Sequence, residues 1–525
     1  MTGSTSRPDV CIIGAGIAGA LTAYELGRAG WKVVVLEAGP RHASGNRFAY
    51  MERHLDDRNP WETDNPERDV YTNAGKINYP LSWTRVKAVG GSTLHWGGNC
   101  PRRHETDFRM RSLYGVGRDW PIGYDELEPY YCRAEAYLGV AGPADNPFAS
   151  RRSKDYPLPP FPFSYADQVV REACERIGVE LHQVPYAKNS QPYQNRPACQ
   201  RFSTCWVCPI EAQYNAGVHV RLAEQTGNVA VIDGASVVRI FESRGRVAGA
   251  AYITPDRVEH LQEARIFVLA AHAIESARIL LLSKSGGFPE GLANKSGQVG
   301  KNFMEHPYLR TRGRAKKKMF PYRIGFHTSE SWQYCATPQR EKTAAFKLEF
   351  GPGGPQPKDI AEKSGNWGES LQAEIRQGFG YEIGVGAMVE QLPDENNSIS
   401  LDPVVMDCFG NPAPRITYAI GDYEREALRA VEAKILKIQE ALGTSDIERN
   451  GGKFTASAHH MGTCRMGNDP DASVVDRNLK AHDLENLYIV GGSVFVTGGT
   501  ANPTLTIAAL ALRASESLLK DLPRR

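Results

Sequence analysis

The chain has 525 residues, of which 41% are hydrophobic and 23% are charged, so it is long enough to bury a large core and to divide into two or more domains. Its 62 Lys and Arg residues balance 60 Asp and Glu residues, which excludes binding to nucleic acid through overall positive charge and leaves no acidic excess. Ten cysteines in a chain of this length are too few for a disulfide scaffold, and a reducing compartment is the default expectation.

Nothing in the sequence predicts a membrane span or an export signal. No apolar run reaches 18 residues, and the first residues, MTGSTSRPDV, contain neither an apolar signal region nor a twin-arginine pair. We therefore expect a cytoplasmic protein by default, or a periplasmic one if the chain is exported together with a signal-bearing partner.

Residues 9–37, DVCIIGAGIAGALTAYELGRAGWKVVVLE, predict a strand, a helix and a second strand. Gly14, Gly16 and Gly19 occupy the turn between the first strand and the helix, where they allow a pyrophosphate to approach the helix N-terminus. Glu37 ends the second strand, where its carboxylate can bind ribose hydroxyls and would repel a 2′-phosphate. A tight turn without a ligand is the simpler alternative, but the combination of strand, helix and acid favours a dinucleotide site.

A second glycine-rich stretch, AVGGSTLHWGGN, covers residues 88–99. Its glycines allow the backbone to approach a flat ring, while the hydroxyls and the imidazole between them can contact that ring. The candidate cofactor contacts are Gly90, Gly91, Ser92, His95 and Trp96. This stretch suits a flavin ring that stays bound better than a nicotinamide that exchanges.

The segment RPACQRFSTCWVCPIEA, residues 196–212, brings Cys199, Cys205 and Cys208 close together in sequence. A disulfide between two of them would leave the third unpaired, and a structural zinc site normally needs a fourth ligand that is not nearby in sequence. A cluster with three iron sites needs only three thiolates. Buried cysteines without a ligand are the remaining alternative.

Four further stretches follow the pattern of regular elements. The β-branched runs of residues 229–254, with charged turns between them, predict antiparallel strands, and IFVLAA at residues 266–271 predicts a strand that leads into a helix. Near the C-terminus, NLYIVGG at residues 486–492 predicts a strand and residues 505–522 predict a helix with one apolar face. Because nucleotide-type elements occur at the start, middle and end of the chain, their domain must be discontinuous.

Two stretches, residues 141–165 and 351–370, are rich in Pro, Gly and polar residues and predict loops.

The stretch ASAHHMGTCRMG, residues 456–467, places His459 and His460 about forty residues before Asn502. Oxidation of a hydroxyl needs a base for the proton, and a neutral imidazole can serve near physiological pH. A neighbouring amide can hydrogen-bond the developing alkoxide and orient the substrate. Taken alone, any one histidine is more often structural than catalytic.

In combination, GAGIAG, Glu37, AVGGSTLHWGG, HHMGTCRMG and NPTLTIAALALR resemble the glucose-methanol-choline (GMC) family of flavoprotein oxidoreductases, in the family's order and over nearly the whole chain. Within that family the chain is most similar to the catalytic subunits of bacterial FAD-dependent sugar dehydrogenases, through residues 110–131, 196–216 and 299–307.

The resemblance implies an α/β fold with a discontinuous Rossmann-like FAD-binding domain and an inserted α+β substrate-binding domain that contains an antiparallel sheet. We expect the FAD-binding domain to comprise residues 1–130, 210–305 and 455–525, and residues 131–209 to form a cysteine-bearing insertion. The substrate-binding domain would then comprise residues 306–454.

The resemblance also implies roles for single residues. His459, with the family's H-x-x-G-T spacing, would be the catalytic base, Asn502 would be its partner, and His460 would be a neighbour or a substrate contact. Some members attach the flavin covalently at the position of His95, so a covalent link stays open there. The C-terminal strand departs from the family, because Gly491, Gly492 and Ser493 stand where many members have an acidic residue followed by Ala and Ser, which leaves backbone amides as cofactor contacts.

The related sugar dehydrogenases carry a [3Fe-4S] cluster at the position of Cys199, Cys205 and Cys208, although this chain has one residue fewer between the second and third cysteines. The resemblance then implies FAD and a [3Fe-4S] cluster as cofactors, a small signal-bearing subunit and a haem-containing electron acceptor as partners, and a sugar or glycoside as substrate. The expected reaction oxidises a secondary or anomeric hydroxyl to a carbonyl by hydride transfer to flavin N5. The alternatives are an oxidase that uses oxygen and a flavin-binding assembly protein without turnover.

Overall fold

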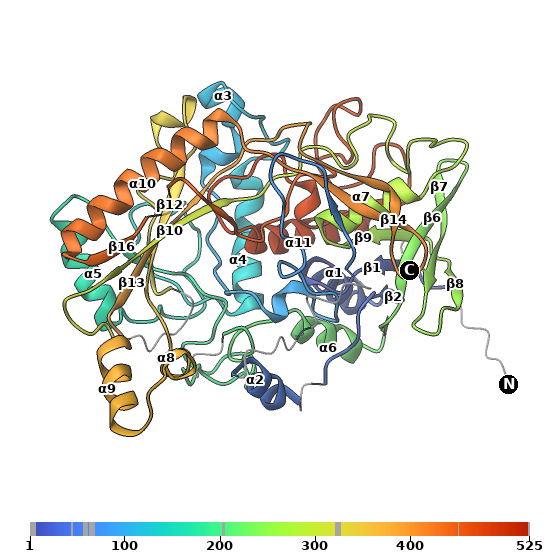
Figure 1. Ribbon diagram of the computed structural model, residues 1–525. Coiled ribbons are helices and arrows are strands. Elements are labelled where there is room, and N and C mark those ends of the chain that lie inside the picture. The colour runs from blue at the N-terminus through green and yellow to red at the C-terminus, as the bar shows by residue number, and fades with distance from the viewer. Residues whose placement is uncertain are drawn as a thin grey trace.

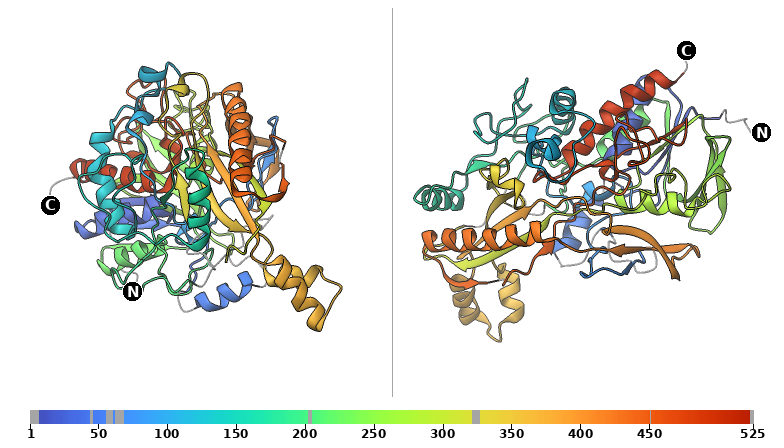
Figure 2. Two further views of the ribbon diagram at one scale, coloured as in Figure 1. Left: turned by 90° about the vertical axis from the view of Figure 1, so that its left-hand side faces the viewer. Right: turned by 90° about the horizontal axis from the view of Figure 1, so that it is seen from above.

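The computed structural model describes residues 7–43, 46–55, 61, 69–201, 205–320, 327–449 and 451–522. A parallel sheet and its helices form one end of the molecule, and an antiparallel sheet beneath a long helix forms the other (Figures 1 and 2). The helices α4 (Tyr124–Leu138) and α11 (Thr504–Asp521) pack against each other between these two parts. This architecture confirms the predicted α/β fold, with an antiparallel sheet added to a nucleotide-binding unit.

The parallel sheet has the strand order β18-β9-β1-β2-β5. Its strands are β1 (Val10–Ile13), β2 (Val33–Leu36), β5 (Val229–Ile232), β9 (Ile266–Leu269) and β18 (Leu487–Ile489). Every residue of β1, β2 and β9 is buried, because α1 (Ile17–Arg28), α6 (Gly217–Gln225) and α11 pack together beside the sheet. Strands from three distant parts of the chain thus form one sheet, as the discontinuous arrangement predicts.

The strand β5 corrects one prediction. We expected residues 229–232 to be antiparallel, but β5 pairs in parallel with β2, with Val229 opposite Val33. A short apolar run of four residues carries no periodicity that separates the two directions, so only its neighbour in the sheet decides. The following strands β6 (Ser236–Ser243) and β7 (Arg246–Ile253) do form the predicted antiparallel pair, and β8 (Glu259–Gln262) extends it.

The antiparallel sheet at the other end has the order β16-β10-β13-β12-β11-β4, with β17 also paired to β10. Its strands are β4 (His182–Gln183), β10 (Pro307–Arg314), β11 (Ser329–Ser331), β12 (Phe346–Gly353), β13 (Glu382–Val389), β16 (Ser445–Glu448) and β17 (Thr455–Ala456). The helix α10 (Asp422–Leu442) covers one face, because Leu428, Val431, Ile435 and Ile438 recur at helical spacing and are buried. The helix α5 (Tyr165–Glu175) packs beside it.

A third sheet, of order β14-β15-β3, lies against α7 (Ala273–Leu282). It combines β14 (Ser398–Met406) and β15 (Pro412–Thr417) with β3 (Thr72–Asn73) from the N-terminal part of the chain. The short helices α2 (Arg47–Leu55) and α3 (Met110–Tyr114) complete the elements of that part. The predicted domain boundaries stay a prediction.

The two predicted loops differ in outcome. Residues 141–164 contain no helix or strand, but residues 351–370 include the end of β12, the helix α8 (Pro357–Lys363) and the start of α9 (Gly368–Gly378). Pro357 is at the first position of α8, where proline suits a helix. The helix α9 fully buries none of its side chains, and Leu371 and Ile375 are its only large apolar residues, so its apolar stripe is too narrow to stand out in the sequence. Both helices project from the end of the antiparallel sheet (Figures 1 and 2).

In the part of the chain that the structure describes, no helix is both long enough and apolar enough to cross a bilayer.

Candidate active site

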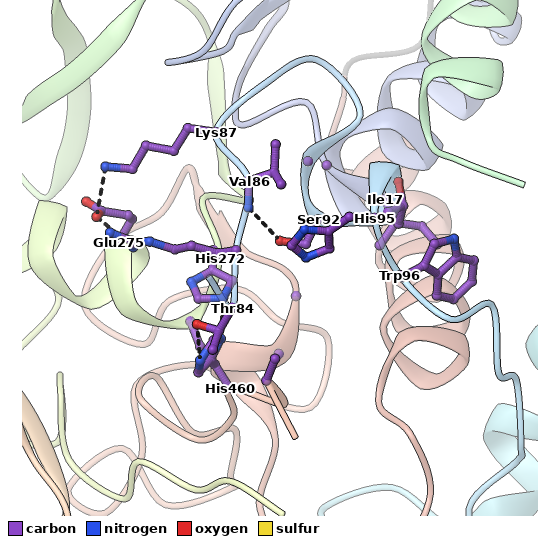
Figure 3. A pocket seen from close by; sticks show the side chains of 18 of the residues that line it. Ile17, Thr84, Val86, Lys87, Ser92, His95, Trp96, His272, Glu275 and His460 are labelled. Carbon is purple, nitrogen blue, oxygen red and sulfur yellow. Dashed lines mark hydrogen bonds and ion pairs between the residues drawn. The ribbon is translucent and has the colours of Figure 1, made fainter. Parts of the chain in front are cut away.

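One cavity of about 820 Å³ connects the parallel sheet with the antiparallel sheet. The predicted site residues that line it are Gly14, Gly16, Glu37, Gly91, Ser92, His95, Trp96, His459, His460, Gly492 and Asn502. Figure 3 shows the part of its wall that carries Ile17, Ser92, His95 and His460. Residues predicted from five separate stretches of sequence therefore line one cavity.

The first glycine loop, residues 14–19, is shaped for a phosphate group. Gly14 has a φ of +104°, and a Cβ there would lie 2.6 Å from the carbonyl oxygen of Ala270. A Cβ on Gly19 would lie 1.9 Å from the carbonyl oxygen of Gly14, so this glycine permits the close packing of helix on strand. A Cβ on Gly16 would meet open space, on the cavity side.

The N-terminus of α1 supplies the charge for that phosphate. Gly16 is the N-cap, no side chain caps the helix, and its first turn carries no acidic residue. The first backbone N–H groups and the positive end of the helix dipole are thus available to an anion in the cavity.

Glu37 lies at the end of β2, where the sequence places it. Its Oε2 accepts a hydrogen bond from the backbone N of Ala15 at 2.8 Å, and its Oε1 accepts one from the backbone N of Gly39 at 2.9 Å. Burial raises the pKa of its carboxyl to about 7. The carboxylate forms the cavity wall beyond the first glycine loop, at a position suited to a ribose.

The second glycine loop, residues 88–99, packs directly on the first. The backbone N of Gly90 donates to the carbonyl of Ala15 at 3.0 Å, and a Cβ on Gly91 would lie 3.0 Å from the Cα of Gly16. The Oγ of Ser92 accepts a hydrogen bond from the backbone N of Val86 at 3.2 Å (Figure 3). Because the two loops touch, a phosphate on one and a ring on the other can belong to one ligand.

His95 and Trp96 follow in the same loop and face the cavity. The ring of His95 lies edge-on to that of Trp206 at 5.4 Å, and burial lowers the pKa of His95 to about 4. The indole N–H of Trp96 donates to the carbonyl of Tyr214 at 2.8 Å. The covalent link left open at His95 stays a prediction.

His459 and Asn502 meet at the far end of the cavity. The Nδ2 of Asn502 lies 3.4 Å from the Nε2 of His459, whose Nδ1 lies 2.9 Å from the Nδ1 of His306. The backbone N of His459 donates to Glu305 Oε1 at 2.8 Å. Burial, and then the charges of His306 and Lys347, hold the pKa of His459 well below its ordinary value. A neutral imidazole beside an amide can take a proton from a hydroxyl while the amide binds the oxygen.

His460 turns away from this pair. Its Nε2 lies 2.7 Å from the hydroxyl of Tyr79. Its Nδ1 lies 2.7 Å from the Nε2 of His272, and Figure 3 shows these two histidines as neighbours. Both ring nitrogens are thus engaged by protein groups. Of the two roles left open for His460, this geometry fits the neighbour better than the substrate contact.

The remaining predicted contacts lie where β18 ends. Gly491 has a φ of +121°, and a Cβ on Gly492 would lie 2.5 Å from the carbonyl oxygen of His460. The backbone carbonyl of Ser493 accepts from the backbone N of Cys464 at 2.7 Å. Gly19, Gly90 and Ser493 lie behind the residues that line the cavity.

Sequence reasoning missed the polar side chains that line the same cavity as His459 and Asn502. Its residues are Asn99, Tyr308 and Arg310 of β10, His327, and Glu349 of β12. Tyr308 and Arg310 alternate with the buried Leu309 and Thr311, so an alternating pattern in this strand could have revealed them.

The three clustered cysteines lie just behind the second glycine loop. The Nε2 of Gln213 donates both to the carbonyl of Trp96 at 2.7 Å and to the carbonyl of Cys205 at 3.1 Å, and Trp206 reaches the cavity. All ten cysteines are free thiols, so the structure does not contain the disulfide alternative. The cysteine loop is therefore held against the predicted flavin site.

Each of the three sulfur atoms accepts a hydrogen bond. The Sγ of Cys199 accepts from the backbone N of Arg201 at 3.4 Å, that of Cys205 from the Nζ of Lys188 at 3.2 Å, and that of Cys208 from the backbone N of Gln213 at 3.5 Å. Donors of this kind favour thiolates, but at Cys199 burial has the larger effect and raises the pKa of the thiol.

Glu305 allows a prediction about pH. Burial raises the pKa of its carboxyl from 4.5 to about 7, so the folded state prefers the protonated form. The free energy of unfolding should therefore fall as the pH rises from about 4.5 to about 7, by about 3 kcal/mol at most. Glu305→Gln keeps a side-chain oxygen that can accept from the backbone N of His306 and of His459, but its amide does not ionise, so its stability should not fall over this pH range.

We expect the melting temperature of Glu305→Gln, relative to that of the natural protein, to increase as the pH rises from 5 to 8. Glu362→Gln, at an exposed position, is the control. Melting curves that run parallel over this range would contradict the expectation.

Comparisons with known proteins agree with this geometry. Residues 393–511 match the family described as GMC oxidoreductase, and residues 9–136 match the family described as FAD dependent oxidoreductase. The chain is 33% identical to the fructose dehydrogenase large subunit of Gluconobacter japonicus, with 99% of each chain covered. It is 31% identical to the 6'''-hydroxyparomomycin C oxidase of Streptomyces lividus, over 98% of this chain and 92% of that one. Pyridoxine 4-oxidase from Mesorbium loti shares the fold, with a TM-score of 0.67 at 18% identity, over 98% of this chain and 99% of that one.

Proposed function

The chain belongs to the GMC oxidoreductase family, as an FAD-dependent oxidoreductase that acts on CH–OH groups, and from this we propose that it is a dehydrogenase for a secondary or anomeric hydroxyl of a sugar, sugar acid or glycoside. The observation that carries this proposal is the pairing of His459 and Asn502 in a cavity that is also lined by other hydrogen-bonding side chains. Two relatives, covered over 99% and 92% of their length, are named a fructose dehydrogenase large subunit and a 6'''-hydroxyparomomycin C oxidase, which supports a sugar-like substrate.

The residues around the cavity fit FAD. Open space at Gly16, the uncapped N-terminus of α1 and the carboxylate of Glu37 suit the dinucleotide part, while the second glycine loop suits the flavin ring. When bound, FAD supplies the acceptor for the hydride that leaves the substrate carbon.

The protein's own contribution is to hold the hydroxyl and take its proton. The Nε2 of His459 is placed to accept that proton, and the Nδ2 of Asn502 is placed to donate a hydrogen bond to the same oxygen. The contact of 3.4 Å between these two atoms is long for a hydrogen bond, so both atoms can form shorter hydrogen bonds with one substrate oxygen.

Cys199, Cys205 and Cys208 would hold a [3Fe-4S] cluster, which would carry single electrons from the flavin to a haem protein. Three thiols with a hydrogen-bond donor each, in a loop fixed to Trp96 through Gln213, fit such a group. Within the described ranges, no group of three metal-ligating side chains with ligand atoms within 4.8 Å of one another includes a cysteine. This spacing argues against a zinc site formed by the three thiols. We also propose a small signal-bearing subunit that would take the chain to the periplasm, since one relative is named a large subunit.

An anaerobic panel of sugars, sugar acids and glycosides tests the proposed activity. We expect one class to bleach the flavin absorbance, with a carbonyl product identified by NMR. A panel that never bleaches the flavin would favour the non-catalytic alternative. Comparing oxygen with dye acceptors separates the dehydrogenase from the oxidase, because an oxidase would consume oxygen at the full rate of flavin reduction.

Substitution of Cys205 tests the electron exit. In Cys205→Ser, purified without air, we expect iron and acid-labile sulfide to be lost and turnover with a haem acceptor to fall at least about tenfold, while anaerobic flavin reduction is unchanged. Cys174→Ala, in α5 and away from the cavity, is the matched control. A protein that contains no iron before substitution, or a variant with unchanged acceptor turnover, would refute the cluster.

A further inference from the structure

Lys347 of β12 is a buried cation directly behind the catalytic amide. Its side chain is 1% exposed, and its Nζ donates to the Oδ1 of Asn502 at 2.7 Å. The same Nζ lies 2.7 Å from Glu330 Oε1 and 3.0 Å from Glu349 Oε1. An ammonium in the protein interior needs such partners, because burial of an unpaired charge is costly.

The carboxylates around Lys347 are themselves fixed. Glu330 accepts hydrogen bonds from the indole N–H of Trp332 at 2.6 Å and from Asn99 Nδ2 at 2.5 Å, and it pairs with His327 at 2.7 Å. Within the described residues, His327, Glu330 and Glu349 are the one group of three that could hold a metal ion, with ligand atoms within 4.8 Å of one another. The ammonium of Lys347 already supplies a cation at this place, so the cluster positions a lysine and needs no metal.

The contact with Lys347 decides which way the amide of Asn502 points. An ammonium can only donate hydrogen bonds, so the atom that faces it must be the amide oxygen. The amide nitrogen of Asn502 then faces His459 Nε2 and the cavity. Without this anchor, the two ends of the amide would be free to exchange places.

The orientation of Asn502 in turn selects the form of His459. An N–H that faces Nε2 requires this nitrogen to carry no proton, so the proton of a neutral His459 lies on Nδ1, where His306 accepts it at 2.9 Å. This is the form in which Nε2 can act as a base. The charge of Lys347 also opposes a positive charge on the imidazole.

We propose, on the basis of the function proposed above, that Lys347 is a positioning residue of the reaction. It fixes the amide of Asn502 with its N–H toward the substrate oxygen and keeps His459 ready to accept a proton. Lys347 does not itself touch the substrate, since it does not line the cavity.

The pH dependence of His459 has other contributors that the experiment must account for. His306 precedes β10 and Lys347 lies on β12, while His460 follows in the chain and Glu305 accepts the backbone N–H of His459. The test variants below change Lys347 and, in one case, Glu330, and they leave His306, His460 and Glu305 as they are.

Lys347→Met is the first test, in the holoenzyme. We expect the limiting rate of anaerobic flavin reduction to fall about 10- to 100-fold, because the amide donor is no longer oriented. We also expect the acidic limb of that rate against pH to move to higher pH, because removal of the positive charge raises the pKa of His459. The FAD content should stay the same, and Lys437→Met, on the exposed side of α10, is the control for loss of a lysine.

The titration of His459 can also be followed without a substrate, by NMR of protein labelled with ¹³C in histidine, with the signal assigned through His459→Gln. If no sugar reduces the flavin, the proposed function fails, yet this titration still tests Lys347. A folded Lys347→Met protein whose His459 titrates as in the natural protein overturns the proposal.

If Lys347→Met does not fold, the double variant Lys347→Gln with Glu330→Gln replaces it, because it removes one charge of each sign. The amide that takes the place of the ammonium keeps a donor toward Asn502 but carries no charge. We expect the limiting rate of this double variant to fall below that of the natural protein while the titration of His459 still moves to higher pH. Titration at the natural pH in this folded variant overturns the proposal in the same way.

Discussion

His459→Ala is expected to lower the rate of flavin reduction by the substrate about 10²- to 10⁴-fold, while FAD remains bound. The loss follows from the position of Nε2 beside Asn502, where the neighbouring His460 cannot replace it because Tyr79 and His272 engage both of its ring nitrogens. Stopped-flow absorbance of the flavin without oxygen measures the effect, and the FAD-to-protein absorbance ratio confirms retention.

The control for this variant is His260→Ala, which changes an exposed histidine of β8 in the three-stranded sheet β6-β7-β8. It should reduce at the natural rate. Unchanged reduction in His459→Ala would reject His459 as the base. Loss of FAD from the variant would instead show that its ring is needed to hold the cofactor.

Gly19→Ala should impair folding, whereas Gly16→Ala should leave folding intact and weaken FAD binding. The Cβ of Gly19→Ala would lie 1.9 Å from the backbone oxygen of Gly14, so β1 and α1 would have to separate and we expect a loss of more than about 3 kcal/mol of stability. The Cβ of Gly16→Ala meets no protein atom within 4 Å, and the φ of −72° at this position suits alanine. This variant should fold.

The added methyl group of Gly16→Ala occupies the space that a pyrophosphate would enter, and overpacking of about 1–3 kcal/mol corresponds to roughly 5- to 150-fold weaker FAD binding. Soluble yield and thermal melting report folding, and titration of the apoprotein with FAD reports affinity. Gly178→Ala, at a left-handed turn with no atom near its Cβ, controls for loss of a glycine outside the site. Natural FAD affinity in Gly16→Ala would place the pyrophosphate elsewhere.

The elements that sequence predicted well are those in which the signal is local. The strand, turn and helix of residues 10–28 depend on glycines two to five positions apart and on a continuous apolar run, and the structure reproduces them. The helix α11 was likewise visible from its apolar face. In both cases the residues that determine the structure are neighbours in sequence.

The predictions that failed concern segments without a decisive local signal. The four residues of β5 have the same apolar pattern in either direction, and their parallel pairing is decided by β2, almost two hundred residues earlier. Residues 351–370, expected to be a loop, contain α8 and the start of α9; α8 buries only Ile360 and α9 buries no side chain, so neither helix shows a wide apolar face in the sequence.

For the candidate site, sequence patterns identified the chemical groups: the glycines for a dinucleotide, Glu37 for a ribose, and the pair His459 and Asn502 for proton transfer. The arrangement of these groups depends on the folded protein, because the protonation and orientation of a side chain depend on the groups that burial places against it. Lys347 stands 155 positions from Asn502 in the chain, and its contact with the amide oxygen exists only because the antiparallel sheet folds over the cavity.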